Sequence, residues 1–203
     1  MRNPRFPRNT LNNMPPAARI TDPVLHPLPP VLQPGPGSPN VLIGFLPAWR
    51  GVPAAVAAAL QAAKQVSDTT IQVAQAATLA AAGTPGAPAA KAAEETTKAA
   101  AATSMGSMIT SSAAGADIHA CVTPFPFPPH GPGVVIDGCS TVMINNLPAC
   151  YLGNTILEPI GPPNKIAMGC PTVMICTPSQ AQTLQTDAPF CEACERAKAA
   201  QNA

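Results

Sequence analysis

The chain has 203 residues, of which 10% are charged, and its formal net charge is +1. This balance provides no field to attract nucleic acid, and no basic patch with interleaved aromatic residues is present, so nucleic acid is not expected as a partner. One Trp, one Tyr and five Phe stand against 27 Pro, which excludes a core built on aromatic packing. We therefore expect a small aliphatic core that a metal ion or a docking partner supplements.

The first residues, 1–13, carry Arg2, Arg5 and Arg8 among Pro and Asn, and we expect an arm that is flexible or becomes ordered on docking. This N-terminus lacks the apolar stretch of a secretory signal peptide, and the chain has no run of about 18 uncharged apolar residues that would span a membrane. Seven cysteines, an odd number at irregular spacing, argue against a fully paired disulfide framework and suit a reducing cytoplasm.

Two short phrases each occur three times. The first reads GSPNVLI, GCSTVMI and GCPTVMI, at residues 37–43, 138–144 and 169–175, and predicts a tight turn that leads into a short strand. The second reads PAAR, PAWR and PACY, at 16–19, 47–50 and 148–151. Units of about thirty residues are too small to bury their own apolar faces, so the copies should stack around a common axis. We expect a mainly β domain, 14–52 with 115–176, in which three β-hairpin repeats form a pseudo-threefold prism or cone.

The composition changes between residues 53 and 114 to Ala and other helix formers, interrupted at 83–86 by Gly-Thr-Pro-Gly. We expect an antiparallel helical hairpin inserted between repeat units. A spacing of three and four residues predicts its buried stripe, formed by Val56, Leu60, Ala63, Val66, Thr70, Val73 and Ala77. The pairs Lys91–Glu95 and Glu94–Lys98 should lie on a solvated face. The hairpin is either an adaptor that grips another protein or a decoration that pads a small core.

Lining up the copies of the second phrase brings three polar residues into register, Asp22, Asp117 and Asn154. Four residues later, the same alignment superposes three residues that can bind metal, His26, Cys121 and Glu158. This register position is therefore a candidate metal site.

The candidate zinc ligands are His26, His119, Cys121 and His130. On an extended segment His119 and Cys121 point to the same side, and His130 follows after a stiff Pro-rich strap. Three imidazoles and one thiolate make a tetrahedral zinc set with no open position for water, which predicts one structural zinc. Two alternatives stay open: Glu158 replaces one of these ligands, or the residues are singly solvated, hydrogen-bonded or buried.

The last residues, 177–203, form a polar tail with Cys191 and Cys194 in a CxxC motif. A second Cys pair for a zinc ribbon and a βαβ context for a redox motif are both missing. The roles that remain for this motif are an apolar contact, an occasional disulfide or a second metal site. The tail is too short for a toxin domain. Cys139 and Cys170 occupy turn positions of the first phrase, and we expect both to be buried turn residues.

The interleaved phrases resemble the PAAR-repeat family, named for the Pro-Ala-Ala-Arg motif that residues 16–19 spell out. The resemblance covers about residues 14–52 and 115–176. It implies a β-cone whose apex is closed by zinc on three His and one Cys, here His26, His119, His130 and Cys121. It also implies the tip of a contractile injection machine, of the type VI secretion or extracellular phage-tail-like kind, seated on a trimeric spike protein.

The function that this resemblance implies is mechanical and not enzymatic. The protein would assemble in the cytoplasm, leave the cell with the injection particle and be driven through a target envelope, touching the target membrane transiently. One alternative is a cargo adaptor that attaches an effector to the spike or tube through the hairpin or the tail. Another is a zinc hydrolase in which His26, His119 and His130 bind the metal and Glu158 is the general base, which needs an open zinc position and a cleft.

Overall fold

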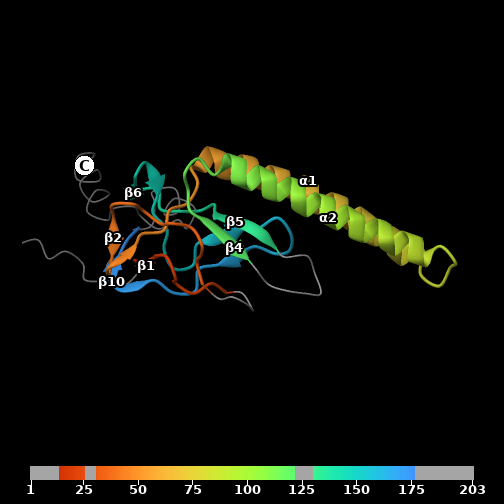
Figure 1. Ribbon diagram of the computed structural model, residues 1–203, viewed down its shortest axis with the longest axis horizontal. Helices are drawn as coiled ribbons and strands as arrows, with labels where there is room; N and C mark the ends of the chain where they lie inside the picture. Colours follow the sequence, from red (N-terminus) through yellow and green to blue (C-terminus); the bar gives the residue numbers. More distant parts are fainter. Residues whose placement is uncertain (1–13, 26–30, 122–129, 177–203) are drawn as a thin grey trace, which may run out of the picture.

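The computed structural model describes residues 14–25, 31–121 and 130–176, except for the side chain of Cys121. The predicted arm 1–13, the ligand His26, the Pro-rich strap and the tail 177–203 with its CxxC lie outside these residues. Two long helices stand beside small antiparallel sheets, and no sheet in the described part of the chain closes into a barrel. Figure 1 shows the helices extending away from a β region that holds all the strands.

Three short antiparallel hairpins carry the repeated phrases. Their strands are β2 (Leu42–Ile43) with β3 (Leu46–Pro47), β6 (Met143–Ile144) with β7 (Leu147–Pro148), and β1 (Pro16–Ala17) with β10 (Cys170–Met174). The register is the same in all three, because the Leu or Met of the first phrase always lies opposite the Pro of the second: Leu42 with Pro47, Met143 with Pro148, and Met174 with Pro16. In the third hairpin the two strands come from opposite ends of the described chain.

Tight turns close the first two hairpins. Gly44 and Phe45 have φ of 55° and 68°, and Asn145 and Asn146 have φ of 52° and 63°. Two successive positive φ values are typical of the type I′ turn, whose twist matches that of the strands it joins. Gly and Asn tolerate this conformation, and Phe45 adopts it with its side chain 95% exposed.

A ring of three backbone hydrogen bonds joins the copies of the second phrase. The N–H of Ala18 donates to the carbonyl of Cys150 at 2.8 Å, that of Cys150 to Trp49 at 3.0 Å, and that of Trp49 to Ala18 at 3.0 Å. Each donor is the third residue of its phrase, so the three bonds are equivalent. The preceding residues, Ala17, Ala48 and Ala149, are fully buried, and their small side chains let the three chains approach closely.

The remaining strands form a four-stranded antiparallel sheet in the order β4-β5-β8-β9. Their bounds are β4 (Ile118–Cys121), β5 (Gly131–Val135), β8 (Thr155–Leu157) and β9 (Asn164–Lys165). The core beside this sheet is aliphatic except for Trp49 and Cys150, and its fully or almost fully buried members include Leu32, Val135, Ile156 and Ile166. For the described residues, the sequence prediction of a core with little aromatic content is confirmed.

The Ala-rich segment forms helices α1 (Ala54–Ala80) and α2 (Ala87–Ser112), packed against each other. The predicted stripe on α1 is partly wrong. Val66 and Val73 are 69% and 66% exposed, whereas the buried positions are Ala57, Leu60, Lys64 and Ile71. A two-helix hairpin buries only a narrow seam, and the weak apolar periodicity of an Ala-rich sequence did not locate it.

Charged residues also enter this seam. Lys91 and Glu95 form the predicted exposed pair at 2.8 Å, but Glu94 and Lys98 are buried, contrary to the prediction of a solvated face. Hydrogen bonds from Lys98 and from Thr78 of the facing helix hold the pKa of Glu94 at about 2. The seam therefore combines Ala contacts with buried ion pairs.

The helical hairpin is inserted into a turn that the other copies make with two residues. The backbone N–H of Asp22 donates to the carbonyl of Arg19 and that of Asn154 to Tyr151. In the second copy the N–H of Asp117 makes the same bond to the carbonyl of Arg50, at 3.0 Å, although both helices intervene. The turn geometry of the repeat thus tolerates the insertion.

The root of the hairpin is part of the core. Leu60 of α1 and Met105 and Ile109 of α2 pack with Val134 of β5 and Leu157 of β8 in one buried cluster. This packing supports the interpretation that the hairpin covers a small core. It does not account for the part of the hairpin that extends beyond the β region (Figure 1).

Ile109→Ala tests this packing. Ile109 is fully buried, so the variant should lose about 2–5 kcal/mol of unfolding free energy, measured by urea denaturation. Met108→Ala, at a neighbouring position that is 40% exposed, should change it by about 0.5 kcal/mol or less. Equal midpoints for the two variants would contradict a hairpin root that belongs to the core.

Candidate metal centre

Each copy of the second phrase is followed by a side chain that caps the turn. A side-chain oxygen accepts a hydrogen bond from the backbone N–H of the last residue of the phrase: Asp22 from Arg19 at 2.7 Å, Asp117 from Arg50 at 2.8 Å, and Asn154 from Tyr151 at 2.7 Å. The register predicted for these three polar residues is therefore confirmed. Local bonds of this kind fix the direction of the chain after the turn, and His26, His119, Cys121 and Glu158 follow within four residues of a cap.

His119 lies on β4, two residues after its cap, and is 1% exposed. The equivalent residues of the other copies, Val24 and Ile156, are also buried, at 3% and 0% exposure. The second copy thus places an imidazole where the other two have an aliphatic side chain. A buried imidazole must be hydrogen-bonded or coordinated, so this substitution within the repeat marks the position as special.

His130 and Glu158 meet beside this strand. Nδ1 of His130 lies 2.8 Å from Oε2 of Glu158, and Oε1 of the same carboxylate lies 4.0 Å from Nε2 of His119. Glu158 is fully buried, whereas the His130 side chain is 22% exposed. Gly133 makes room for this arrangement, because a Cβ there would lie 3.1 Å from Cγ of Glu158. Two of the predicted ligands are therefore brought to one buried carboxylate.

The other two predicted ligands are less completely described. The backbone of Cys121 pairs with Gly131 in the β4–β5 ladder, and His26 lies outside the described residues. Among residues 14–25, 31–120 and 130–176, no group of three or more His, Cys, Asp or Glu side chains has the arrangement of a metal site. The structure thus places His119 and His130 together and leaves the full ligand set as a prediction.

The donor chemistry at this place fits zinc. Two imidazoles and a buried carboxylate are ligand types that zinc accepts, and Cys121 lies on the same strand as His119, two residues along. A carboxylate that bonds to one imidazole nitrogen leaves the other nitrogen of that ring to bind a metal, the common arrangement around ligating histidines. Glu158 can therefore either orient His130 or bind the ion itself.

Cys150 and Cys170 are buried thiols outside this centre. Burial raises the pKa of the Cys150 thiol well above its usual value, as expected of a small core residue. Cys170 is buried as predicted, but it is the first residue of β10 and not a turn residue; its Sγ lies 3.3 Å from Oγ1 of Thr172.

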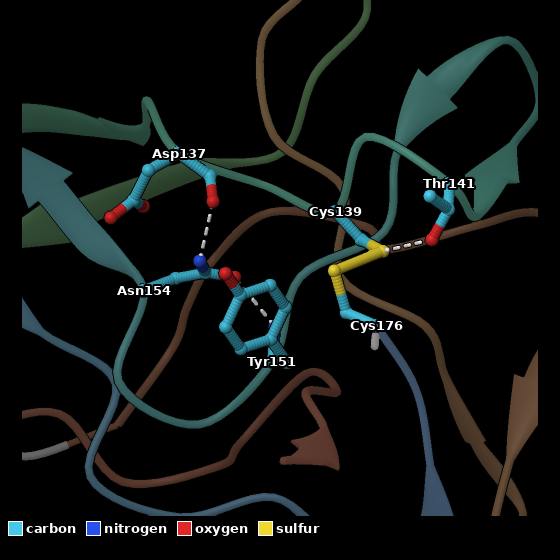
Figure 2. The surroundings of a disulfide bond; sticks show 6 residues. All are labelled: Asp137, Cys139, Thr141, Tyr151, Asn154 and Cys176. Carbon is cyan, nitrogen blue, oxygen red and sulfur yellow. Dashed lines mark hydrogen bonds between the residues drawn. A yellow bond between two sulfur atoms is a disulfide. The ribbon is translucent and has the colours of Figure 1, made fainter. Parts of the chain in front are cut away.

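The prediction for Cys139 needs a correction. It is fully buried in its turn, as expected, but its sulfur forms a disulfide with Cys176, just beyond β10 (Figure 2). Cys176 follows the third copy of the first phrase, so the bond joins two copies through cysteines that are 37 residues apart in sequence. The pairing depends on how the copies meet in space, which their spacing along the chain did not reveal.

Comparison of the chain with family models, with curated proteins and with solved structures gave no match. Within the part of the chain that the structure describes, no helix has both the length and the apolar character needed to cross a membrane.

Proposed function

We propose that this chain is a PAAR-repeat tip that caps the trimeric spike of a contractile injection machine. In this proposal the three hairpins form one end of a pseudo-threefold β-prism, and the metal centre closes the other. The protein acts mechanically: it assembles on the spike in the cytoplasm, leaves the cell with the particle and is pushed through a target envelope.

The observation that carries the proposal is the ring of equivalent hydrogen bonds among Ala18, Trp49 and Cys150. Three equivalent bonds that run in one direction around a ring relate the copies by an approximate threefold axis. A single chain with such an axis can match a partner built from three identical chains, because each copy meets the same surface of one spike protomer.

A second observation concerns exposed apolar side chains at equivalent positions. Leu42, Met143 and Met174 each lie opposite a Pro in their hairpins, and they are 61%, 53% and 44% exposed. Large apolar side chains exposed at three symmetry-related positions are suited to contact with a threefold partner. Short strands such as these also present unpaired edges that a partner can cover.

The zinc proposed here is structural. His26, His119, Cys121 and His130 would hold it, with Glu158 either orienting His130 or taking the place of one ligand. When bound, the ion would link converging chains where little apolar surface is available for a core. A hydrolase is disfavoured by the full burial of Glu158, because a general base must reach water or substrate.

The hairpin favours cargo attachment as a second candidate function. Val66 and Val73 lie on one side of α1, and both are more than half exposed although α1 packs extensively against α2. An exposed apolar helix face of this kind suits a partner helix. A chain that lacks the outer half of the hairpin, residues 72–97, should still bind the spike in either case, but it would lose cargo only if the hairpin is an adaptor.

The test of the proposed function is assembly with the purified trimeric spike protein from the same source. Native mass spectrometry should find one copy of this chain on each spike trimer. A triple variant, Leu42→Asp with Met143→Asp and Met174→Asp, should reduce binding at least about 100-fold, since charges replace three apolar contacts. The matched control, Val66→Asp with Val73→Asp, should bind the trimer normally. Binding that survives the triple variant, or that fails in the control alone, would overturn the proposed docking surface.

A further inference from the structure

The third hairpin differs from the other two because no turn joins its strands. β2 and β3 are connected through Gly44 and Phe45, and β6 and β7 through Asn145 and Asn146, whereas β1 and β10 lie near opposite ends of the described chain. In the described part of the chain, β1 and β10 are held together by their ladder and by packing alone. This hairpin therefore lacks the direct covalent connection that a turn gives the other two.

Two positions of the first phrase face each other between neighbouring copies. We name the second residue of the phrase the inner position, occupied by Ser38, Cys139 and Cys170. The residue directly after the phrase is the outer position, occupied by Gly44, Asn145 and Cys176. All three outer residues have a positive φ, of 55°, 52° and 65°, so their backbones are alike.

Each inner residue meets the outer residue of the next copy. The hydroxyl of Ser38 donates a hydrogen bond to Oδ1 of Asn145 at 2.7 Å. Cys139 forms its disulfide with Cys176. At the third pair, a Cβ built on Gly44 would lie 2.9 Å from Sγ of Cys170. One contact is therefore made three times in three chemical forms: a hydrogen bond, a disulfide and a glycine lying against a thiol.

We infer that these contacts are repeated clasps that hold neighbouring hairpins together, and that Cys139–Cys176 is the redox-sensitive clasp that fastens the hairpin without a turn. The cross-link joins the residue just after β10 to the second copy, and so ties this strand covalently to the neighbouring hairpin, although it does not link β10 to β1 (Figure 2). Within the described residues Cys170 forms no disulfide, because the residue opposite it is Gly44. The inference rests on the repeat geometry and holds whatever the protein docks on.

The chemistry of closure is a thiol oxidation. The Cys139 and Cys176 thiols together give up two protons and two electrons as the S–S bond forms, and a low-molecular-weight disulfide such as oxidised glutathione accepts them and becomes two thiols. Reducing surroundings run the reaction backwards. The clasp is therefore open in a reducing cytoplasm and closed in oxidising surroundings outside the cell.

Because the three clasps are equivalent, mutation should convert the disulfide into a hydrogen bond, or the glycine–thiol contact into a disulfide. Cys139→Ser with Cys176→Asn reproduces at the second pair the hydrogen bond that Ser38 makes with Asn145. This variant should fold and keep its ring without a disulfide. The reverse exchange, Gly44→Cys, should give Cys170 a partner. About 3 Å separates Cβ from the opposite sulfur in a disulfide, close to the distance found here. A hydrogen bond from Thr172 lowers the pKa of Cys170, which favours its reaction.

The experiment uses the full chain with Cys191→Ser and Cys194→Ser, so that the tail cannot contribute disulfides, and a phosphine reductant. The oxidised protein should lose about 4–16 °C in Tm on reduction. The Tm of the variant Cys139→Ser with Cys176→Asn should not depend on reductant. The control Cys170→Ser should lose as much Tm on reduction as the parent protein. If the double exchange does not fold, Cys176→Asn alone serves, because Cys176 is only partly buried.

Peptic digestion and mass spectrometry complete the test. In the oxidised protein, Cys139 and Cys176 should resist alkylation and appear in one linked peptide pair, and Gly44→Cys should add a second pair with Cys170. Alkylation of Cys139 and Cys176 in the oxidised protein, or an equal effect of reductant on the exchanged variant, would overturn the redox-sensitive clasp. A folded Gly44→Cys variant with both thiols free under oxidant would overturn the equivalence of the three contacts.

Discussion

Replacing Asp117 with alanine is expected to lower the free energy of unfolding by about 3–5 kcal/mol. Asp117 is fully buried, and its carboxylate binds the guanidinium of Arg50 at 2.8 and 3.0 Å and the backbone N–H of the same residue at 2.8 Å. Arg50 is itself 7% exposed, so the variant leaves a buried cation without its anion. Chemical denaturation monitored by the fluorescence of Trp49, the neighbour of Arg50, measures the effect.

The other copies provide the controls. Asp22→Ala should cost less, because the side chain of its partner Arg19 is 18% exposed and can be hydrated. Asp117→Asn keeps an oxygen for the backbone N–H, as Asn154 does in the third copy, and should fall between wild type and Asp117→Ala. Equal losses for Asp22→Ala and Asp117→Ala would show that burial of the Arg50 pair adds nothing to the cap.

The sequence predicted those parts of the molecule that local rules determine. Aligning the second phrase predicted that Asp22, Asp117 and Asn154 are equivalent, although not that they cap turns, and the Gly and Pro residues at 83–86 predicted the break between the helices. The buried side of α1 was predicted less well, since Ala-rich helices carry little periodic signal and a long aliphatic stem lets Lys64 be buried.

Contacts between copies could not be predicted from the sequence, for a different reason. The disulfide joins the inner position of one copy to the outer position of the next, and its partner follows only once the order of copies around the ring is known. His130 and Glu158 meet for the same reason, because β5 lies between β4 and β8 in the sheet. The substitution of His119 for an aliphatic residue was visible in the alignment, as a mismatch with Val24 and Ile156.

His119→Val separates a metal-binding role from a core role. Valine is the residue that the first copy has at this buried position, so in a purely structural core the change should be neutral or slightly stabilising. If His119 binds zinc, elemental analysis should find about one zinc per wild-type chain, and the variant should lose it. With free zinc at about 1,000 times its Kd, loss of the site would remove about 4 kcal/mol of unfolding free energy and lower Tm by about 8–16 °C.

Chelator treatment and the variant Glu158→Gln test the metal-binding role further. Treatment of the wild type with a strong chelator should lower its Tm to that of His119→Val, and the variant should not respond. Glu158→Gln should weaken zinc binding about 10–100-fold if Glu158 only orients His130, and should abolish it if the carboxylate is itself a ligand. Substitution with cobalt distinguishes these outcomes further, because the visible spectrum reports the ligands of the ion. A His119→Val protein that is as stable as the wild type and keeps its zinc would remove His119 from the ligand set.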